Sequence, residues 1–399
     1  MKLNPAVEQL KPSPTLALNQ KAKALIASGK SVVNLTTGEP DFVTPKRICE
    51  AAKKAMEQGH TKYTPTSGIP ELKRAILEYI FKEYGRTYSL QSVIVTSGAK
   101  QALFNLCFSL LNPGDEVIVF SPYWVSYTDM VELMQAKAII LSTQEENRFI
   151  PEFTQLENAI NNKTRFLFLN SPSNPTGAVY PKDSLRKIAD LIKKWPNVLV
   201  VTDDIYGKLV FDGFSFTSIA MFQDFPFNQL VIINGMSKSY SMTGWRIGYA
   251  LGPEPLISAM DAVQSQSISC ATSIAQWAAL EAITGDQSDV IEMRDTFEKR
   301  RDFLYNKIGS IPDLTCFKPQ GAFYIFPNVN SFLGKNTPRK QRIETDSELA
   351  SYLLEEYGLA SVPGCAFGSP GYLRLSFATS MNELEEGVER LKKGLSALQ

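Results

Sequence analysis

The sequence predicts an α/β protein: a large domain with a mostly parallel sheet covered by helices, together with a smaller α+β domain. Short β-branched runs alternate with helical patterns through most of the first 300 residues, which is typical of a parallel sheet. From about residue 254 to 307 the pattern becomes helical, and shorter strands and helices follow. The length of 399 residues fits two or three domains at roughly 100 to 200 residues each.

Several apolar runs are expected to form the large sheet, and some are apolar on both faces, as strands between two helical layers are. In chain order they are SVIVTS (92–97), DEVIVF (115–120), TRFLFLN (164–170), NVLVVTD (197–203), QLVIING (229–235) and RIGYAL (246–251). Helices are expected over 100–111, ended by N-P-G-D, and over 184–194. The helical stretch 254–307 should break near Thr284 and Gly285, and 331–345 should be a surface loop.

The composition excludes several classes of function. With 41 basic and 41 acidic residues there is no net field for polyanions, which argues against nucleic acid as the main partner. A single histidine, His60, excludes a multi-histidine metal site, and five dispersed cysteines support neither a zinc cluster nor a disulfide framework. The N-terminus lacks an apolar signal core, and no run reaches the ~18 apolar residues of a membrane span. We therefore expect a cytoplasmic protein.

Ligands of open α/β sheets bind at the carboxyl ends of the strands, so the residues there are informative. Gly98, Ala99 and Lys100 follow one strand and open a helix whose backbone N–H groups face any anion, although many such turns bind nothing. Trp124 follows the next strand and either packs in the core or stacks on a planar ring. Asn174 lies in a turn made rigid by two X-Pro steps.

Two further strand ends carry charge. Asp203 ends an apolar strand, just before Tyr206, and its carboxylate needs a cation or strong donor there. Lys238 follows another strand, and Arg246 opens the next one. One interpretation is that both are solvated cations on a loop. The other is that the loop is partly buried, as Trp245 and its apolar neighbours indicate, so that the lysine amine can attack a carbonyl.

Together these residues match the needs of pyridoxal phosphate: an amine for the aldehyde, a carboxylate for the ring nitrogen, donors for the phenolic oxygen, an aromatic face and a phosphate cradle. In that order the sequence offers Lys238, Asp203, Tyr206 with Asn174, Trp124, and Gly98 and Ala99 with Ser237 and Arg246. Arg374, in a strand-like run, suits the α-carboxylate of an amino acid.

At these residues the chain resembles the class I, fold-type I pyridoxal-phosphate aminotransferases, most closely the bacterial-type aspartate aminotransferase branch. The similarity extends from about residue 11 to near the C-terminus. It rests on V-N-L-T-T-G-E-P-D-F (33–42), K-Y-T-P-T-S-G (62–68), S-G-A-K-Q-A-L-F-N-L (97–106), S-P-Y-W-V-S-Y (121–127), N-P-T-G (174–177), S-K-S-Y-S-M-T-G-W-R-I-G-Y (237–249) and R-L-S-F (374–377).

The resemblance implies a role for each residue. Lys238 would be the Schiff-base lysine and proton shuttle, Asp203 would keep the pyridine nitrogen protonated, and Tyr206 would complete the catalytic set. Family members are homodimers with sites at the subunit interface, so Tyr63 would reach the neighbouring subunit's phosphate. The cofactor-binding set is Tyr63, Gly98, Ala99, Lys100, Trp124, Asn174, Asp203, Tyr206, Ser237, Lys238 and Arg246, and the substrate-binding set is Gly38, Lys100, Trp124, Asn174 and Arg374.

The resemblance also implies domain limits. An N-terminal segment over 1–44 would join the small domain, 45–290 would form the large cofactor-binding domain, and 291–399 the small C-terminal domain. The acidic residue after Asp203 is Asp204, where the family more often has glutamate. This departure should have little effect.

The implied reaction moves the α-amino group of L-aspartate to 2-oxoglutarate. No lysine or arginine lies between Arg246 and Arg294, where the animal-type branch has its distal-carboxylate arginine, so the resemblance nominates Lys100 instead, against the alternative of a surface lysine. Prephenate, aromatic or alanine transamination and a carbon–sulfur lyase stay open, and Thr15 lies in the segment that closes over the substrate. A serine acyl-transfer enzyme, a nucleotide-dependent oxidoreductase and a DNA-reading regulator lack their motifs.

Overall fold

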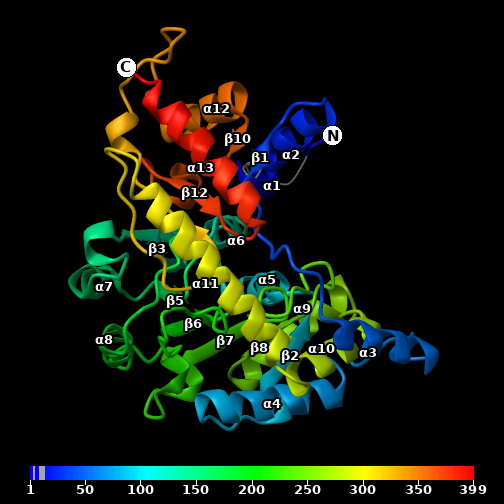
Figure 1. The fold of residues 1–399 in the computed structure, drawn as a ribbon. Helices are drawn as coiled ribbons and strands as arrows, with labels where there is room; N and C mark the ends of the chain where they lie inside the picture. Colours follow the sequence, from blue (N-terminus) through cyan, green and yellow to red (C-terminus); the bar gives the residue numbers. More distant parts are fainter. Residues whose placement is uncertain (3–4, 9–13) are drawn as a thin grey trace.

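A seven-stranded sheet forms the centre of the larger part of the computed structural model, which describes residues 1–2, 5–8 and 14–399 (Figure 1). Its order is β2-β8-β7-β6-β5-β3-β4, and β8 is the one strand that runs opposite to the other six. The strands are β2 (Val93–Thr96), β3 (Glu116–Ser121), β4 (Lys137–Ser142), β5 (Thr164–Asn170), β6 (Leu199–Asp203), β7 (Leu230–Gly235) and β8 (Gly248–Leu251). The predicted α/β class with a mostly parallel sheet is confirmed.

All six predicted runs form strands, and the limits predicted for β5 coincide with those observed. The edge strand β4 was not predicted. It lies at the end of the sheet beside β3 alone, and its side chains are half-buried or exposed, in contrast to the fully buried run of β2. Its residues 138–141 form a continuous apolar run, as in the central strands, so the sequence carried a strand signal that the prediction left unused.

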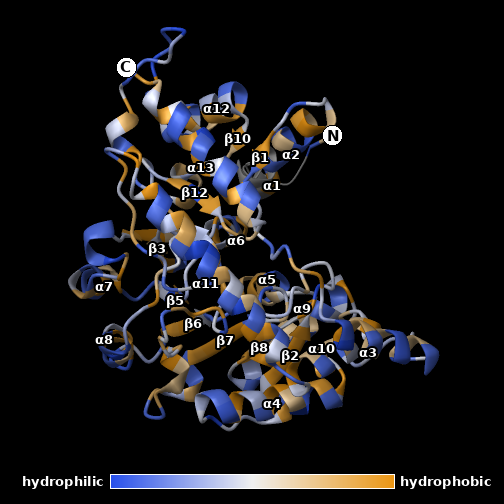
Figure 2. Cartoon of the chain, in the orientation of Figure 1, coloured by the Kyte–Doolittle hydropathy of each residue, from blue (hydrophilic) through white to orange (hydrophobic). Residues whose placement is uncertain are grey.

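Helices cover both faces of the sheet because successive strand residues point to opposite sides. Val200 packs in a cluster with α4 and α8, whereas Val201 packs in another with α5 and α9. Figure 2 shows β6 and β7 mostly in the hydrophobic colour, as strands between two helical layers should be. The helices of this part are α3 (Lys46–Glu57), α4 (Pro70–Tyr84), α5 (Ala99–Leu110), α6 (Ser126–Leu133), α7 (Phe153–Ala159), α8 (Lys182–Ile192), α9 (Glu254–Ser267) and α10 (Ser273–Thr284).

The smaller part joins segments from both ends of the chain. β1 (Val33–Asn34) pairs in parallel with β10 (Leu359–Ala360), and both chain ends lie on this side of the molecule in Figure 1. A three-stranded sheet has the order β11-β12-β9. The elements are α1 (Pro5–Glu8), α2 (Pro14–Ala27), α11 (Ser288–Ile308), β9 (Tyr324–Ile325), α12 (Asp346–Tyr357), β11 (Val362–Pro363), β12 (Leu373–Ser376) and α13 (Met381–Ser396).

Helix α11 connects the two parts. Met293, near its start, packs in the core under the large sheet, and Phe297 and Leu304 pack in a separate core with β9, β12 and α13. The predicted break before α11 is confirmed at Gly285, whose N–H donates to the Glu281 carbonyl as α10 ends. A second break, over 268–272, separates α9 from α10. No helix within residues 5–8 and 14–399 has the length and apolar character needed to cross a membrane.

Candidate active site

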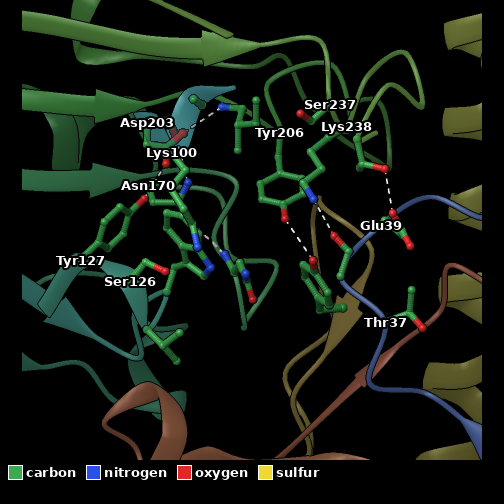
Figure 3. A pocket seen from close by; sticks show the side chains of 18 of the residues that line it. Thr37, Glu39, Lys100, Ser126, Tyr127, Asn170, Asp203, Tyr206, Ser237 and Lys238 are labelled. Carbon is green, nitrogen blue, oxygen red and sulfur yellow. Dashed lines mark hydrogen bonds between the residues drawn. The ribbon is translucent and has the colours of Figure 1, made fainter. Parts of the chain in front are cut away.

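A cavity of about 410 Å³ opens where the carboxyl ends of the central strands meet the smaller part. Asn170 and Asp203 end β5 and β6 side by side, and Lys238 follows β7, because parallel strands end at one edge of the sheet. Arg374 reaches the same cavity from β12. Figure 3 shows how the side chains of the large sheet converge.

The cavity brings together nearly all of the residues predicted from the sequence. Those that line it are Gly38, Ala99, Lys100, Trp124, Asn174, Asp203, Tyr206, Ser237, Lys238, Arg246 and Arg374. Gly98 lies just behind, at φ 82°, and a Cβ there would be 2.5 Å from the Arg246 guanidinium. Tyr63 lies outside the cavity with 88% of its surface exposed. The side chain of Thr15 lies outside the described residues.

Asp203 is buried at the base of the cavity without a cation as hydrogen-bond partner. The Tyr127 hydroxyl donates to its Oδ2 at 2.6 Å (Figure 3), and the Ile205 N–H donates to Oδ1 at 3.3 Å. Burial raises the pKa of Asp203 to about 6, against the lowering effect of Tyr127. A buried carboxylate of this kind is suited to a cationic N–H donor from a ligand.

Asp204 points to the other side of the sheet. It accepts hydrogen bonds from Thr202 Oγ1 at 2.6 Å and from the Tyr84 hydroxyl at 3.1 Å. It therefore belongs to the core behind the sheet and not to the cavity, in agreement with the small role expected for it.

Lys238 presents its amine to the cavity, where Nζ donates to the carbonyl of Gly38. Burial lowers the pKa of Lys238 to about 8, and the charge of Glu39 acts in the opposite direction. A lysine with a lowered pKa has a substantial neutral fraction near pH 8, and the neutral amine is the nucleophile and base.

Arg374 is held in one orientation by its neighbours. It is 2% exposed, Nη1 donates to Asn174 Oδ1 at 3.0 Å, and Nη2 donates to the Thr36 carbonyl at 2.7 Å. Its guanidinium lies 4.4 Å from the centre of the Tyr324 ring, and its buried Nε has no hydrogen-bond partner among the described residues. A fixed guanidinium with an unused donor is suited to a carboxylate ligand.

A second cationic region lies on the side of α5. Lys100 Nζ lies 4.8 Å from the centre of the Trp124 ring, and Arg246 Nη1 donates to the Thr243 carbonyl at 2.9 Å. Burial, and next the charge of Arg246, lower the pKa of Lys100, which favours an anion as its partner.

Several lining residues were not singled out from the sequence. Tyr127 and Glu39 lie within quoted motifs, yet nothing in their spacing shows that one hydroxyl points to Asp203 and that the carboxylate lies near Lys238. Tyr324, whose hydroxyl is 3.0 Å from that of Tyr206, comes from the smaller part. Asn170, which donates to the Asp203 carbonyl, and Thr36 also line the cavity.

Comparisons with known proteins agree with this site. A family model described as "Aminotransferase class I and II" matches residues 30–391. The chain is 46% identical over 397 residues to "Aspartate aminotransferase" of Geobacillus stearothermophilus, covering 100% of both chains. It is 44% identical over 390 residues to "Aspartate/prephenate aminotransferase" of Cereibacter sphaeroides, covering 98% of each.

A solved structure gives the same result. The crystal structure of the aspartate aminotransferase from Rhizobium meliloti superposes with a TM-score of 0.97 at 42% identity, with both chains fully covered. The family match spans most of the chain, and the cavity lies where the fold places such a site. The chain therefore belongs to the class I and II aminotransferases and is a pyridoxal-phosphate-dependent enzyme of that family.

Proposed function

We propose that the protein transfers the α-amino group of L-aspartate to 2-oxoglutarate, which gives oxaloacetate and L-glutamate, with pyridoxal phosphate bound in the cavity. The observation that carries the proposal is the meeting of Lys238, Asp203 and Arg374 around one cavity. The names of the relatives support aspartate as the amino donor.

The residues present fit this cofactor. The buried Asp203 carboxylate lacks the cationic donor that a protonated pyridine nitrogen would supply. Gly98, lacking a side chain, lets the Arg246 guanidinium approach the start of α5, so that a cation and helix N–H groups are available to a phosphate. Ser237 would add a hydroxyl and Trp124 an aromatic face.

When bound, the cofactor supplies an electron sink for the bonds of the substrate's α-carbon. Asp203 would hold the proton on the ring nitrogen, and the Tyr206 hydroxyl would donate to the phenolic oxygen. Lys238 would hold the cofactor's aldehyde carbon. Arg374 and Asn174 would fix the substrate α-carboxylate, which places the α-hydrogen within reach of the Lys238 amine.

Lys238 would also move the proton. Its neutral amine would take the α-proton, and the Gly38 carbonyl, which already accepts from Nζ, would hold the resulting ammonium in place. The same amine would then release the proton to the cofactor's carbon. Both steps would use one base and exclude bulk water as the proton carrier.

Lys100 would bind the side-chain carboxylate of aspartate. We expect Lys100→Ala to raise KM for aspartate about tenfold, because a charge-assisted hydrogen bond on a partly exposed lysine is lost. KM for alanine and phenylalanine should change little, and steady-state kinetics on the three donors measures this. Lys54→Ala, on the surface of α3, is the control. An equal rise in KM for all three amino donors would show that Lys100 does not bind the side-chain carboxylate and is a surface lysine.

The exposed Tyr63 supports a homodimer in which this residue completes the partner's phosphate site. We expect mixed dimers of Lys238→Ala and Tyr63→Ala chains to contain one intact site, because each supplies what the other lacks. Cofactor affinity at that site, measured by fluorescence titration after separation of tagged hybrids, should equal that of the wild type. Hybrids no better than the Tyr63→Ala homodimer would contradict this arrangement.

The reaction itself is tested by absorbance spectra of the loaded protein. Aspartate should convert the aldehyde form of the cofactor to its amine form, and 2-oxoglutarate should reverse the change. Prephenate is the second acceptor to assay, since some relatives are named aspartate/prephenate aminotransferases. A loaded protein that cycles only with aromatic amino acids or alanine, or that eliminates from a carbon–sulfur substrate, would overturn the assignment to aspartate.

A further inference from the structure

A short segment over residues 36–42, which we name the strap, links the two sides of the cavity. It follows β1 and makes polar contacts to three neighbouring parts of the chain: β12, the loop between β7 and β8, and α11. These contacts are Thr36 carbonyl to Arg374, Gly38 carbonyl to Lys238, Glu39 Oε2 to Thr243 Oγ1 at 2.7 Å, and Asp41 to Arg300 at 2.7 and 2.9 Å. These contacts fix Glu39 next to Gly38, whose carbonyl accepts the hydrogen bond from Lys238 Nζ.

The charges around the cavity are unbalanced. Among the described residues that line it, four are cationic (Lys100, Lys238, Arg246, Arg374) and two are acidic (Glu39, Asp203). Asp203 is buried at the base, where it accepts from Tyr127, and would serve the cofactor's ring nitrogen. Glu39 is the remaining carboxylate on the strap side, the side where Lys238 Nζ meets Gly38 (Figure 3).

We propose that Glu39 is a positioning residue that acts through Lys238: its carboxylate, held by Thr243 next to the residue whose carbonyl accepts from Nζ, stabilises the protonated amine without pairing with it directly. The inference rests on the proposed function, because it takes Lys238 as the amine that receives the cofactor. Glu39 contacts neither the ring-nitrogen carboxylate nor the carboxylate-binding arginine. Within the cavity its charge acts on the Lys238 amine and also on Tyr324, whose pKa is raised mainly by burial and further by Glu39.

The surroundings of Lys238 support this role. Glu39 contributes the largest effect raising the pKa of Lys238, second only to the burial that lowers it; Arg374 and Arg246 lower it further and Asp203 raises it. The other titratable groups lining the cavity are Lys100, Tyr127, Tyr206 and Tyr324. Without Glu39 the amine would face two arginines with only Asp203 to offset them.

A purely structural role for Glu39 would be to tether the strap to Thr243. Two variants separate the roles. Glu39→Gln removes the charge and keeps an oxygen that accepts from Thr243, whereas Thr243→Val keeps the charge and removes the hydroxyl that donates to it. The first variant therefore changes only the charge, and the second changes only the hydrogen bond that tethers the strap.

The experiment follows attachment of pyridoxal phosphate to the full-length chain after the cofactor has been stripped. In attachment, Nζ bonds to the aldehyde carbon and the aldehyde oxygen leaves as water, so only the neutral amine reacts. We expect Glu39→Gln to lower the midpoint of the rate–pH profile by about 0.5 to 1 unit, since an opposite charge is lost from a partly exposed position. At pH 7 attachment should be about three- to fivefold faster.

Thr243→Val should leave the midpoint within about 0.2 units of the wild type. A midpoint unchanged in Glu39→Gln, or moved equally in both variants, would overturn the inference while the proposed function stands. Failure of the wild type to attach the cofactor at Lys238, seen by peptide mass after borohydride reduction, would instead overturn the proposed function. A second measurement, the pH titration of the cofactor's visible band in each loaded protein, should move in the same direction.

Discussion

Replacement of Lys238 by alanine is expected to lower kcat by about 10⁴-fold or more, because one change removes both the group that holds the cofactor and the base that moves the α-proton. Among the described residues that line the cavity the one other lysine is Lys100, which lies on α5 against Trp124 and is not expected to take its place. Single-turnover measurement of the change from aldehyde to amine form on mixing with aspartate reports the loss directly.

The matched control is Lys100→Ala, which removes the other lysine of the same cavity. Borohydride reduction followed by peptide mass analysis should find the cofactor on residue 238 in the wild type and in Lys100→Ala. In Lys238→Ala the cofactor should be bound without a reducible link. Cofactor found on another lysine of that variant would sink the assignment.

Asp203→Asn is expected to lower kcat by about 10²- to 10³-fold with a much smaller change in KM. A neutral amide cannot hold the ring nitrogen protonated, so the electron sink weakens in the transition state, whereas the substrate still meets Arg374. Asparagine keeps an acceptor for the Tyr127 hydroxyl, which now donates at 2.6 Å. Steady-state kinetics with aspartate provides the split between kcat and KM, and an unchanged kcat would remove the role.

Although Asp203→Asn should lower activity, it should raise the stability of the folded, cofactor-free protein at neutral pH. The pKa of Asp203, raised to about 6 by burial, lies above its ordinary value of 3.8, so the folded state binds this proton more tightly than the unfolded state. Stability due to this group is therefore lost as pH rises from about 4 to 6, and stays low above. Asparagine has no such dependence.

Thermal unfolding at two pH values checks this. The difference in Tm between Asp203→Asn and the wild type should be more favourable to the variant at pH 7.5 than at pH 4.5. An identical difference at both pH values would show that the carboxylate bears no charge cost in the fold. Activity would thus be lost where stability is gained, as expected for a group kept for its chemistry.

The sequence predicted the side of the site that the large sheet supplies. Asp203 and Lys238 each follow a continuous apolar strand, and strand ends of a parallel sheet share one edge, so their meeting could be expected before any coordinates. The predicted limits of β5 coincide with those observed, since its four consecutive apolar residues, 166–169, are flanked by polar residues and turn signals.

The contacts between distant segments could not be predicted in this way. No periodicity places Tyr324 beside Tyr206 or Glu39 beside Thr243, because the two residues of each pair are 118 and 204 positions apart in the sequence. The edge strand β4 was missed although residues 138–141 are continuously apolar; its position at the edge of the sheet leaves their side chains only partly buried or exposed. The domain limits near residues 45 and 290 and the cytoplasmic location stay predictions.

The hydrogen bond between Thr36 and Arg374 joins residues 338 positions apart. A nascent chain leaves the ribosome from its N-terminus, so the strands of the large sheet emerge, and can pair, long before Arg374 does. With the roles proposed above, Lys238 and Asp203 would thus be in place before Arg374, which would bind the α-carboxylate of the substrate. Until Arg374 has been made, a growing chain would contain the residues proposed to hold the cofactor and lack the one proposed to hold the substrate carboxylate, so translation would set the order in which the two sites are completed.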